Sequence, residues 1–465
     1  MFAPPTYAHR RRTLCRTLRD ESGLVLFLGN EESAMNAAAN PYPFRQDSTF
    51  LYYFGLDVPG LDAVLDLDDG EARLFGDDPS LDDIVWMGDH PSLRDRAERA
   101  GVDRTAPRSA LSETLANALK QDRPLHLLPP YRPRHRQRLR TLLGDARDDV
   151  EAYVSAPVLD AIVTQRSVKS EAEVEQLEAA LDTTAHMHEA AFERAAPGTS
   201  ERAIAGRLAG IAEAKGRGLS FRPTCSIRGE VLHNHDYSHS LSANDLLLVD
   251  AGGTSPLHYA GDITRVVPVG GPFTDRQRRL YNAVLDAQTT ALNAIEPGTS
   301  FIEIHRHACR VLTNHLIEIG LMNGPVDAAV NAGAHALFFP HGLGHMLGLD
   351  VHDMENLGEN RVGYAEDQSR SDQFGLHTLR LARPLAPGFV LTVEPGLYFI
   401  PALFSQWRDE HRHAEYINYE RTEAFMDIGG IRIEDDVLVT NDGARRLGPE
   451  IPKTVSAVEA QAGAS

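Results

Sequence analysis

The feature that most constrains the fold is an internal repeat in the second part of the chain. The tetrapeptide Pro-Gly-Thr-Ser occupies 197–200 and again 297–300. Each copy follows one segment with helical spacing and precedes another, and strand-like segments come after each helix pair. We interpret this order as a duplication and predict two helix-helix-sheet halves related by pseudo-symmetry. Because sites tend to form between such halves, we expect the functional residues there.

Helix starts in this part of the chain carry a recognisable signal. Serine or threonine followed three residues later by glutamate or glutamine is typical of a capping box. This spacing occurs at three places: Ser170 with Glu173, Thr274 with Gln277, and Ser300 with Glu303. The first helix is long, because apolar residues recur at helical spacing as far as Phe192. We therefore predict an amino-terminal domain at 1–160, a second domain at 161–455 and a disordered tail at 456–465.

The amino-terminal part mixes short apolar runs with turns. The runs at 23–29 and 63–76 are typical of strands, and the second turns back at Asp69-Gly70, a dipeptide suited to a tight hairpin. Residues 125–130 predict a further strand that proline ends. The basic run at 132–140 is typical of a solvated helix face. These elements predict a small α/β domain.

Charge and cysteine content limit the class of protein. The chain has 46 Lys and Arg against 66 Asp and Glu, a formal charge of -20, which disfavours nucleic-acid and anionic-membrane binding. Apolar runs are too short to span a bilayer, and charged residues interrupt any secretory signal at the amino terminus. The three cysteines form no CxxC pair, which indicates a reducing compartment. We expect a cytoplasmic protein.

Four carboxylates lie in or beside strand-like segments, where a charge is costly unless it is compensated. They are Asp250 in LLLVDAGG, Asp262 in AGDITR, Glu394 in LTVEPG and Glu434 in IRIEDD. Basic side chains such as Arg265 and Arg432 are too few nearby to pair with all of them. Two divalent cations would balance the four negative charges, so we predict a dinuclear metal site.

Imidazoles that could complete such a site cluster in FFPHGLGHMLGLDVHD, which contains His341, His345 and His352. The HGLGH string differs from a zincin HExxH motif, because Gly342 replaces the catalytic glutamate and two glycines disfavour a regular helix. Each histidine taken alone is more often a structural residue than a ligand. Only their combination with the four carboxylates favours a metal site.

The strings VDAGG, YAGDITR, FFPHGLGHMLGLDVHD, LTVEPGLYF and GGIRIEDDVLVT, in this order, resemble the proline-specific metallopeptidases of the creatinase and methionine aminopeptidase superfamily. The amino-terminal YPFRQDSTFLYYFGL is similar to the first domain of aminopeptidase P and prolidase. The resemblance implies an α+β class: a pita-bread catalytic domain with pseudo-two-fold symmetry, preceded by the smaller α/β domain.

This resemblance also implies residue roles. Asp250 would bind one metal, Asp262 and Glu434 would bridge both, and His345 and Glu394 would complete the other, with a bridging water as the nucleophile. The assignment requires the turn at 253–256 to absorb one residue more than the family usually has between the two aspartates. The substrate-side histidines would be His233, His341 and His352, which suit the stabilisation of a tetrahedral intermediate.

Three residues receive additional roles. Glu394 would also carry a proton, and Arg432 would orient the bridging Glu434, since strand alternation puts both on one face. LHTLRLARPLAPG resembles the prolidase segment that supplies an arginine for the free carboxylate of an Xaa-Pro dipeptide, at Arg380. The alternative is that Arg380 and Arg383 only solvate the loop. Residues 355–377 are equally compatible with a lid and with a solvated connection.

We predict a dinuclear metallopeptidase that hydrolyses the Xaa-Pro imide bond of proline-containing peptides. Prolidase, the Xaa-Pro dipeptidase, is favoured over aminopeptidase P, which acts on longer peptides. A metal-free creatinase-like hydrolase and a non-catalytic binding module are disfavoured, because all five ligand positions are present. The resemblance and the oxygen-rich ligands favour Mn(II), with Co(II) or Zn(II) as alternatives. Relatives suggest a homo-oligomer, a dimer or a tetramer.

Overall fold

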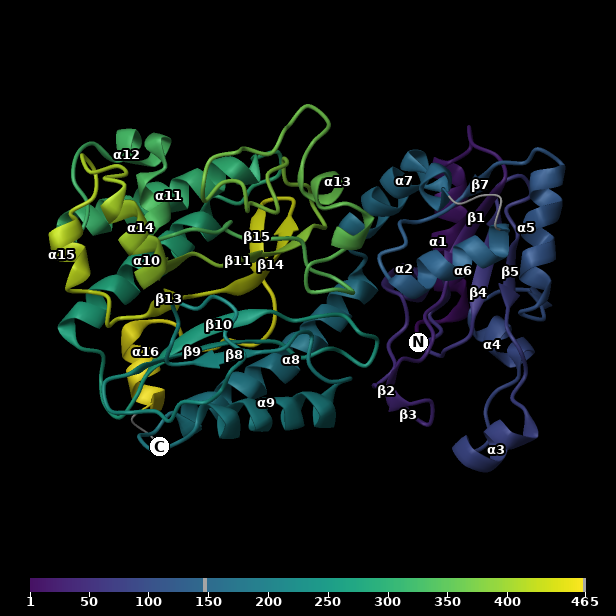
Figure 1. Ribbon diagram of the computed structural model, residues 1–465, viewed down its shortest axis with the longest axis horizontal. Coiled ribbons are helices and arrows are strands. Elements are labelled where there is room, and N and C mark those ends of the chain that lie inside the picture. Colours follow the sequence, from purple (N-terminus) through teal and green to yellow (C-terminus); the bar gives the residue numbers. More distant parts are fainter. Residues whose placement is uncertain (145–148, 463–465) are drawn as a thin grey trace. The chain divides into compact units, whose positions relative to one another are not determined.

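The computed structural model describes residues 1–144 and 149–462. It divides into two compact units, Met1–Arg166 and Ser167–Ser465 (Figure 1). The boundary expected after residue 160 falls within helix α7 (Ala156–Ser167), and the units divide near the end of that helix. Within the described ranges, no helix is long and apolar enough to cross a membrane.

The amino-terminal unit is built on a mixed sheet with the strand order β6-β5-β4-β1-β7. Its strands are β1 (Leu24–Leu28), β4 (Asp62–Asp66), β5 (Ala72–Phe75), β6 (Arg104–Ala106) and β7 (Leu125–His126). Strands β4 and β5 form the predicted hairpin, and Gly70 in its turn has a φ of 74°, which glycine adopts without strain. A separate short ribbon pairs β2 (Ala34–Ala37) with β3 (Asn40–Pro41).

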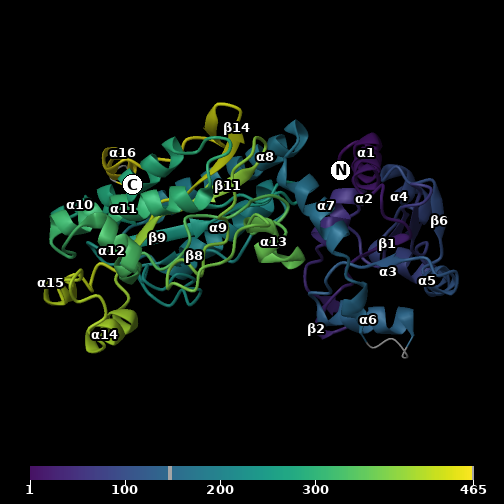
Figure 2. The ribbon, with the colours of Figure 1, turned by 90° about the horizontal axis from the view of Figure 1, so that it is seen from above.

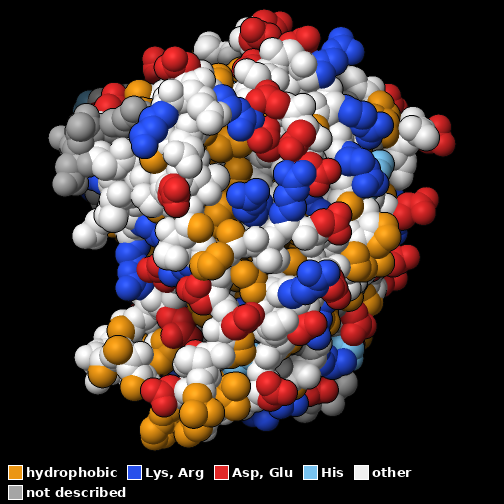
Figure 3. Space-filling model, turned by 90° about the vertical axis from the view of Figure 1, so that its right-hand side faces the viewer, with side chains coloured by type: hydrophobic (Ala, Val, Ile, Leu, Met, Phe, Trp, Pro, Cys, Tyr) orange, Lys and Arg blue, Asp and Glu red, His pale blue; other side chains and the backbone are white. Residues whose placement is uncertain are grey.

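Helices complete this unit: α1 (Pro4–Thr17), α2 (Ser48–Phe54), α3 (Leu81–Met87), α4 (Leu93–Arg99), α5 (Ala110–Lys120), α6 (Pro133–Leu143), α7 and the 3-10 turn η1 (Val150–Tyr153). Most arginines of α6 are exposed, while His135 and Leu139 face the core, as the basic run predicted. Helix α3 exposes the hydrophobic side chains of Leu81, Val85, Trp86 and Met87. Figure 3 shows hydrophobic side chains gathered at the lower end of the face that it draws.

The second unit confirms the predicted duplication of elements. Its first half contains α8 (Glu171–Arg194), α9 (Glu201–Lys215), β8 (Thr224–Ser226), β9 (Leu246–Ala251) and β10 (Ile263–Pro268). Its second half contains α10 (Asp275–Asn293), α11 (Phe301–Ile319), β11 (Val390–Val393), β12 (Gly396–Tyr398), β13 (Gly430–Arg432), β14 (Asp435–Thr440) and β15 (Gly443–Arg446). Each half is a helix pair packed on strands (Figures 1 and 2).

The strands of the two halves form three small sheets. Their orders are β10-β9-β8, β11-β14-β15 and β12-β13. Strands β9 and β10 are buried along their whole length, because α8 covers the sheet. Polar groups placed on these strands are therefore removed from water, and each requires a partner.

The predicted helix starts fare differently. Ser170 with Glu173 and Thr274 with Gln277 form reciprocal capping boxes, as expected. The third prediction is wrong, because the Ser300 side chain makes no cap hydrogen bond. Its hydroxyl donates instead to the carbonyl of Ala382 at 2.8 Å, so a tertiary contact replaces the local one.

Shorter helices fill the rest of this unit: α12 (Val326–Ala332), η2 (Ala334–Leu337), η3 (Glu355–Leu357), α13 (Glu359–Gly363), α14 (Pro401–Asp409), α15 (Tyr419–Glu423) and α16 (Val455–Ala462). Helix α16 lies where we predicted a disordered tail, and that prediction is wrong for 456–462. Val458 is fully buried and Glu459 pairs with Arg278, so α16 packs onto the unit. Residues 463–465 lie outside the described residues.

Candidate metal centre

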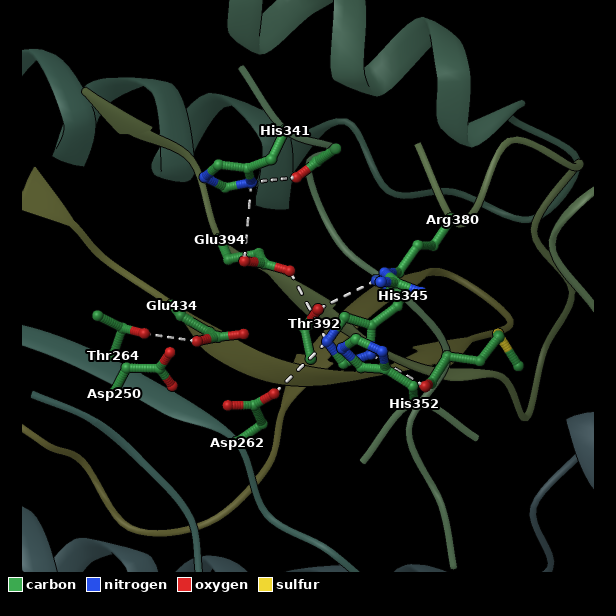
Figure 4. A network of polar contacts seen from close by, with 12 residues as sticks. Asp250, Asp262, Thr264, His341, His345, His352, Arg380, Thr392, Glu394 and Glu434 are labelled. Carbon is green, nitrogen blue, oxygen red and sulfur yellow. Dashed lines mark hydrogen bonds and ion pairs between the residues drawn. The ribbon is translucent and has the colours of Figure 1, made fainter. Parts of the chain in front are cut away.

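The pairing of β9 with β10 brings the first two predicted ligands together. Asp250 lies in β9 and Asp262 directly precedes β10, and the antiparallel register places Thr264 opposite Asp250. Glu394 follows β11, and Glu434 lies between β13 and β14. Figure 4 shows these four carboxylates and His345 turned toward one space. We call these five residues the carboxylate cage.

Distances within the cage suit cation binding. Asp262, His345 and Glu434 each offer a ligand atom, and these atoms lie within 4.8 Å of one another. Nε2 of His345 is 3.4 Å from Oδ2 of Asp262 and 3.7 Å from Oε1 of Glu394. Residues that are far apart in the sequence therefore converge on one point, and the insertion at 253–256 does not separate the two aspartates.

Protein cations compensate only part of the negative charge that the four ionised carboxylates of the cage would carry. Burial, and then the neighbouring carboxylates, raise the pKa of Asp262 and of Glu434 well above the ordinary value, and burial also raises the pKa of Glu394. Oδ1 of Asp262 is buried without a hydrogen-bond partner among the described residues. Ligands of this kind, oxygen-rich and short of protein cations, fit two divalent metal ions.

Hydroxyl and carbonyl groups around the cage fix the ligands. The Thr264 hydroxyl donates to Oε2 of Glu434 at 2.7 Å, and the hydroxyl of Thr392 accepts from the backbone N–H of His345 at 3.1 Å. Nδ1 of His345 lies 3.1 Å from the carbonyl of Met346. That contact places the ring proton on Nδ1 and leaves the Nε2 lone pair facing the carboxylates, as a metal ligand requires.

Arg432 links the cage to a substrate-side histidine. Its guanidinium is buried and donates to Asp250, to the hydroxyl of Thr264 and to the hydroxyl of Tyr398. The Tyr398 hydroxyl lies 2.8 Å from Nε2 of His341, and Nδ1 of His341 lies 2.8 Å from the carbonyl of Gly342. Burial and the charge of Arg432 lower the pKa of His341 to about 3, so this imidazole is neutral. The carboxylate that Arg432 contacts directly is thus Asp250, whereas we expected Glu434.

The other predicted residues lie around the same space. The imidazole of His352 packs against that of His345 in a tilted arrangement, with ring centroids 4.1 Å apart, and its Nδ1 is 3.3 Å from Oε2 of Glu355. Nη1 of Arg380 donates to Glu355 at 2.6 Å and to Glu359 at 3.0 Å. Although burial opposes it, His352 and Arg380 lower the pKa of Glu355 to about 2.

One cavity of about 420 Å³ contains all ten residues that the sequence singled out. Its lining includes the carboxylate cage, Arg432, Arg380 and three histidines, His233, His341 and His352. His233 is exposed at the rim, whereas the cage lies at the buried end. Phe221, Arg222 and His235 also line the cavity, although the sequence analysis gave them no role.

Sequence reasoning missed the residues that hold the ligands in place. Thr264 lies two residues after Asp262, and Thr392 two residues before Glu394, so strand alternation places each threonine on the face of its ligand. That signal was available. No local sequence signal indicated Tyr398 or Glu355, because their roles depend on contacts with Arg432 and Arg380 from distant segments.

Comparison with known proteins agrees with this geometry. Residues 175–441 match metallopeptidase family M24, and residues 7–127 match the aminopeptidase P amino-terminal domain. The Xaa-Pro dipeptidase of Homo sapiens is 33% identical over 98% of this chain and 92% of its own length. A probable Xaa-Pro aminopeptidase, pepP, of Aspergillus fumigatus is 31% identical over 98% of this chain and 96% of its own.

Solved structures show the same architecture. Proline aminopeptidase P II from Yersinia pestis superimposes with a TM-score of 0.82 at 28% identity, covering 100% of both chains. Aminopeptidase PepP of Pseudomonas aeruginosa also gives 0.82, at 26% identity and with 100% and 99% of the two chains covered. With the predicted pita-bread architecture confirmed and both parts of the sequence matched, this chain belongs to metallopeptidase family M24 and is a metal-dependent peptidase.

Proposed function

We propose that this metallopeptidase is an Xaa-Pro dipeptidase that hydrolyses the imide bond before a carboxyl-terminal proline. One observation carries the proposal: Arg380 lines the same cavity as the carboxylate cage. A guanidinium at this place can bind the free carboxylate that a dipeptide presents next to the scissile bond. The names of relatives that match over almost the whole chain, such as the human Xaa-Pro dipeptidase, support the same activity.

Asp250, Asp262, His345, Glu394 and Glu434 would hold the two metal ions of the proposed reaction. When bound, these ions supply Lewis-acid chemistry: they acidify a water for attack on the scissile carbonyl. Glu394, whose pKa is raised by burial, is suited to take a proton and pass it to the leaving proline nitrogen. Its Oε2 lies 3.9 Å from Nδ1 of His341, so the acid and the imidazole face the same substrate atoms.

His233, His341 and His352 would contact the substrate, and their hydrogen bonds fix which ring nitrogen carries the proton. Because the Tyr398 hydroxyl accepts from Arg432, its own proton points to Nε2 of His341. The ring proton of His341 therefore resides on Nδ1, where it is donated to the carbonyl of Gly342. His233 at the rim would supply a donor to the developing oxyanion. His352, whose lowered pKa leaves it neutral, donates its Nδ1 proton to Glu355 and keeps Nε2 as an acceptor.

Arg380 keeps the capacity for substrate although it is already paired. Both of its bonds, to Glu355 and Glu359, are made by Nη1, and a guanidinium has five N–H donors. The two carboxylates fix the direction of the side chain, which lowers the entropy lost when it binds a ligand. Thus the ion pairs are compatible with a clamp and prepare it.

Substrate length tests this proposal. Wild-type enzyme should cleave an Xaa-Pro dipeptide with a higher kcat/KM than a pentapeptide that begins Xaa-Pro. Arg380→Ala should lower kcat/KM for the dipeptide by a factor of about 10 to 150, the loss of one charge-assisted hydrogen bond. Metal content, measured by elemental analysis, should not change. Arg383→Ala is the matched control, since Arg383 lies outside the cavity lining and donates to the carbonyl of Val362.

The second candidate is an Xaa-Pro aminopeptidase that acts on longer peptides. It is favoured by the likeness to the aminopeptidase P structures of Yersinia pestis and Pseudomonas aeruginosa. Equal or better turnover of the pentapeptide, unaffected by Arg380→Ala, would establish it and would remove Arg380 from substrate recognition.

We further propose Mn(II) as the physiological ion, because four carboxylates and one imidazole form an oxygen-rich ligand set. A homo-oligomer and a cytoplasmic location are also proposed. The exposed apolar side chains of α3 support association, and the three free cysteines support a reducing compartment. Elemental analysis and sedimentation of the purified protein test the first two proposals.

A further inference from the structure

A second group of metal-ligating side chains lies in the core of the peptidase unit. His305 and Cys309 are one turn apart on α11, and His335 lies in η2. The three residues each offer one ligand atom, and these atoms lie within 4.8 Å of one another. All three side chains are buried, with at most 4% exposed. None of them belongs to the carboxylate cage or lines its cavity.

The spacing of this cluster approaches that of ligands around one ion. Sγ of Cys309 is 3.5 Å from Nε2 of His305. Sulfur and nitrogen ligands that lie about 2.3 Å and 2.0 Å from a shared ion are about 3.5 to 3.8 Å apart. The other pairs lie within 4.8 Å, and two nitrogen ligands of one ion are about 3.3 to 3.5 Å apart, so these pairs need to approach by no more than about 1.5 Å.

The protein leaves polar capacity unused at the cluster. Nδ1 of His305 and Nδ1 of His335 are both buried, and neither has a hydrogen-bond partner within residues 1–144 and 149–462. The contact between Cys309 and His305 provides a partner for Nε2 of His305 only. It provides none for Nδ1 of His305 or for Nδ1 of His335. Buried polar atoms without partners are rare, and each requires an explanation.

The protonation of the cluster suits a cation. Burial lowers the pKa of His305 to about 3 and of His335 to about 4, so both imidazoles are neutral and keep a lone pair. Burial raises the pKa of Cys309, and the thiol is protonated without an ion. An ion that binds here forms a sulfur–metal bond while the S–H bond breaks, and the proton leaves to solvent with no change of oxidation state.

We propose that His305, Cys309 and His335 bind one Cu(I) ion, as a mononuclear site separate from the carboxylate cage. Soft thiolate ligands select Cu(I) or Zn(II) over the hard ions that carboxylates prefer. One thiolate and two neutral imidazoles make a neutral complex with Cu(I), whereas Zn(II) would leave a positive charge in the core. Zn(II) also prefers four ligands, and this cluster has three.

An aromatic side chain, Phe339, packs against the cluster and against the peptidase site. The ring of Phe339 lies 5.5 Å from the ring of His305 and 4.9 Å, edge on, from the ring of His341. His341 lines the cavity of the carboxylate cage. Phe339 therefore contacts both the buried cluster and a residue of that cavity.

Anaerobic titration of the full chain with Cu(I), against a competing Cu(I) chelator, tests the proposal. The protein is first loaded with Mn(II), and the Mn(II) content and peptidase activity are measured before copper is added. The outcome for the carboxylate cage is then known independently of the copper titration. Wild-type protein should bind one Cu(I) per chain and show a thiolate-to-copper charge-transfer band. Cys309→Ser and His335→Gln should weaken this binding at least about 100-fold. Cys225→Ser, at another buried cysteine, is the matched control and should bind like the wild type.

X-ray absorption at the copper edge of wild-type protein provides a measurement that needs no variant to fold. One sulfur and two nitrogen neighbours are expected. No copper beyond background, a copper environment without sulfur, or undiminished binding by Cys309→Ser would overturn the site. Tight Zn(II) binding with the same dependence on Cys309, and none of Cu(I), would overturn the choice of ion.

Discussion

Three consecutive acidic residues, Glu434, Asp435 and Asp436, are all buried but differ in what surrounds them. Asp435 accepts from Arg265 at 2.7 Å and from Lys453 at 2.6 Å. Burial alone would raise its pKa, but these two cations outweigh burial and lower it. For Glu434 and Asp436, burial and neighbouring carboxylates raise the pKa well above its usual value.

The contrast between Asp435 and Glu434 distinguishes a structural carboxylate from a proposed ligand. Asp436, which accepts from the backbone N–H of Asp262 at 2.9 Å, is not one of the five cage residues. Where the fold needs a buried charge for itself, it supplies protein cations, as it does for Asp435. At the carboxylate cage, Arg432 is the one guanidinium among the described residues that donates to a cage carboxylate, and it is shared with Tyr398, so several negative charges are left to an external cation. Burial alone would not have distinguished the two cases, since all are nearly inaccessible to solvent.

Removal of a cage ligand should have the largest effect. We expect Asp262→Asn to lower kcat/KM for an Xaa-Pro dipeptide by a factor of about 1,000 or more, because metal-ion catalysis supplies several kcal/mol. Metal content should fall in parallel. After a chelator has removed the metal, Asp262→Asn should be at least as stable as the metal-free wild type, since the change relieves repulsion among carboxylates. A loss of stability in the chelated variant would mean that Asp262 is a structural residue.

Substitution of the paired carboxylate should have the opposite pattern. Asp435→Asn leaves Arg265 and Lys453 without their buried partner, which should destabilise the protein by about 3 to 5 kcal/mol. Denaturant unfolding of the chelated protein measures this change. Metal content per folded chain should be retained, and its loss would contradict the separation of the two kinds of carboxylate.

The pH dependence of the unfolding free energy of the metal-free protein compares the carboxylates with raised pKa and the carboxylate with lowered pKa in one experiment. Raised pKa values keep protons on Asp262, Glu434 and Asp436 in the folded state after the unfolded chain has released them, above pH about 4. The unfolding free energy of chelated protein should therefore fall as pH rises from about 4 toward the raised pKa values. Asp435, with its lowered pKa, contributes with the opposite sign and loses its contribution as pH falls below about 4.

The control for this pH series is a variant with one fewer titrating group. Chelated Glu434→Gln should show a shallower decline of stability with pH, and Mn(II) should abolish the decline in the wild type. Stability that rises over the same pH interval in the chelated wild type would contradict the raised pKa values.

The smallest effect is expected from the hydroxyl between Arg432 and His341. Tyr398→Phe removes both hydrogen bonds while it retains the ring. We expect kcat to fall about 10-fold, equivalent to about 1.4 kcal/mol, because His341 loses the contact that fixes its proton. KM and metal content should change little. A large loss of metal would show that Tyr398 acts on Arg432 and Asp250 and not on the histidine.

Much of the site could be predicted because its ligands lie in short contiguous strings. VDAGG and YAGDITR each predict a strand with a carboxylate, and the structure pairs the two as β9 and β10. The duplication followed from element order. These features depend on local pattern, which a sequence carries directly.

What could not be predicted depends on contacts between distant segments. Ser300 bonds to Ala382, and Val458 of the supposed tail is buried, through tertiary contacts that no local spacing reveals. The same holds for His335, which lies about 30 residues from its partners His305 and Cys309. No motif connects them.

Arg432 has a consequence for how the enzyme acquires its ions. Its guanidinium already forms an ion pair with Asp250, whereas Asp262, His345 and Glu434 offer ligand atoms that could bind a metal ion. We therefore expect the first divalent ion to bind at this triad and the second to displace the guanidinium from Asp250. We expect stepwise loading, with a half-filled species that accumulates when metal is scarce.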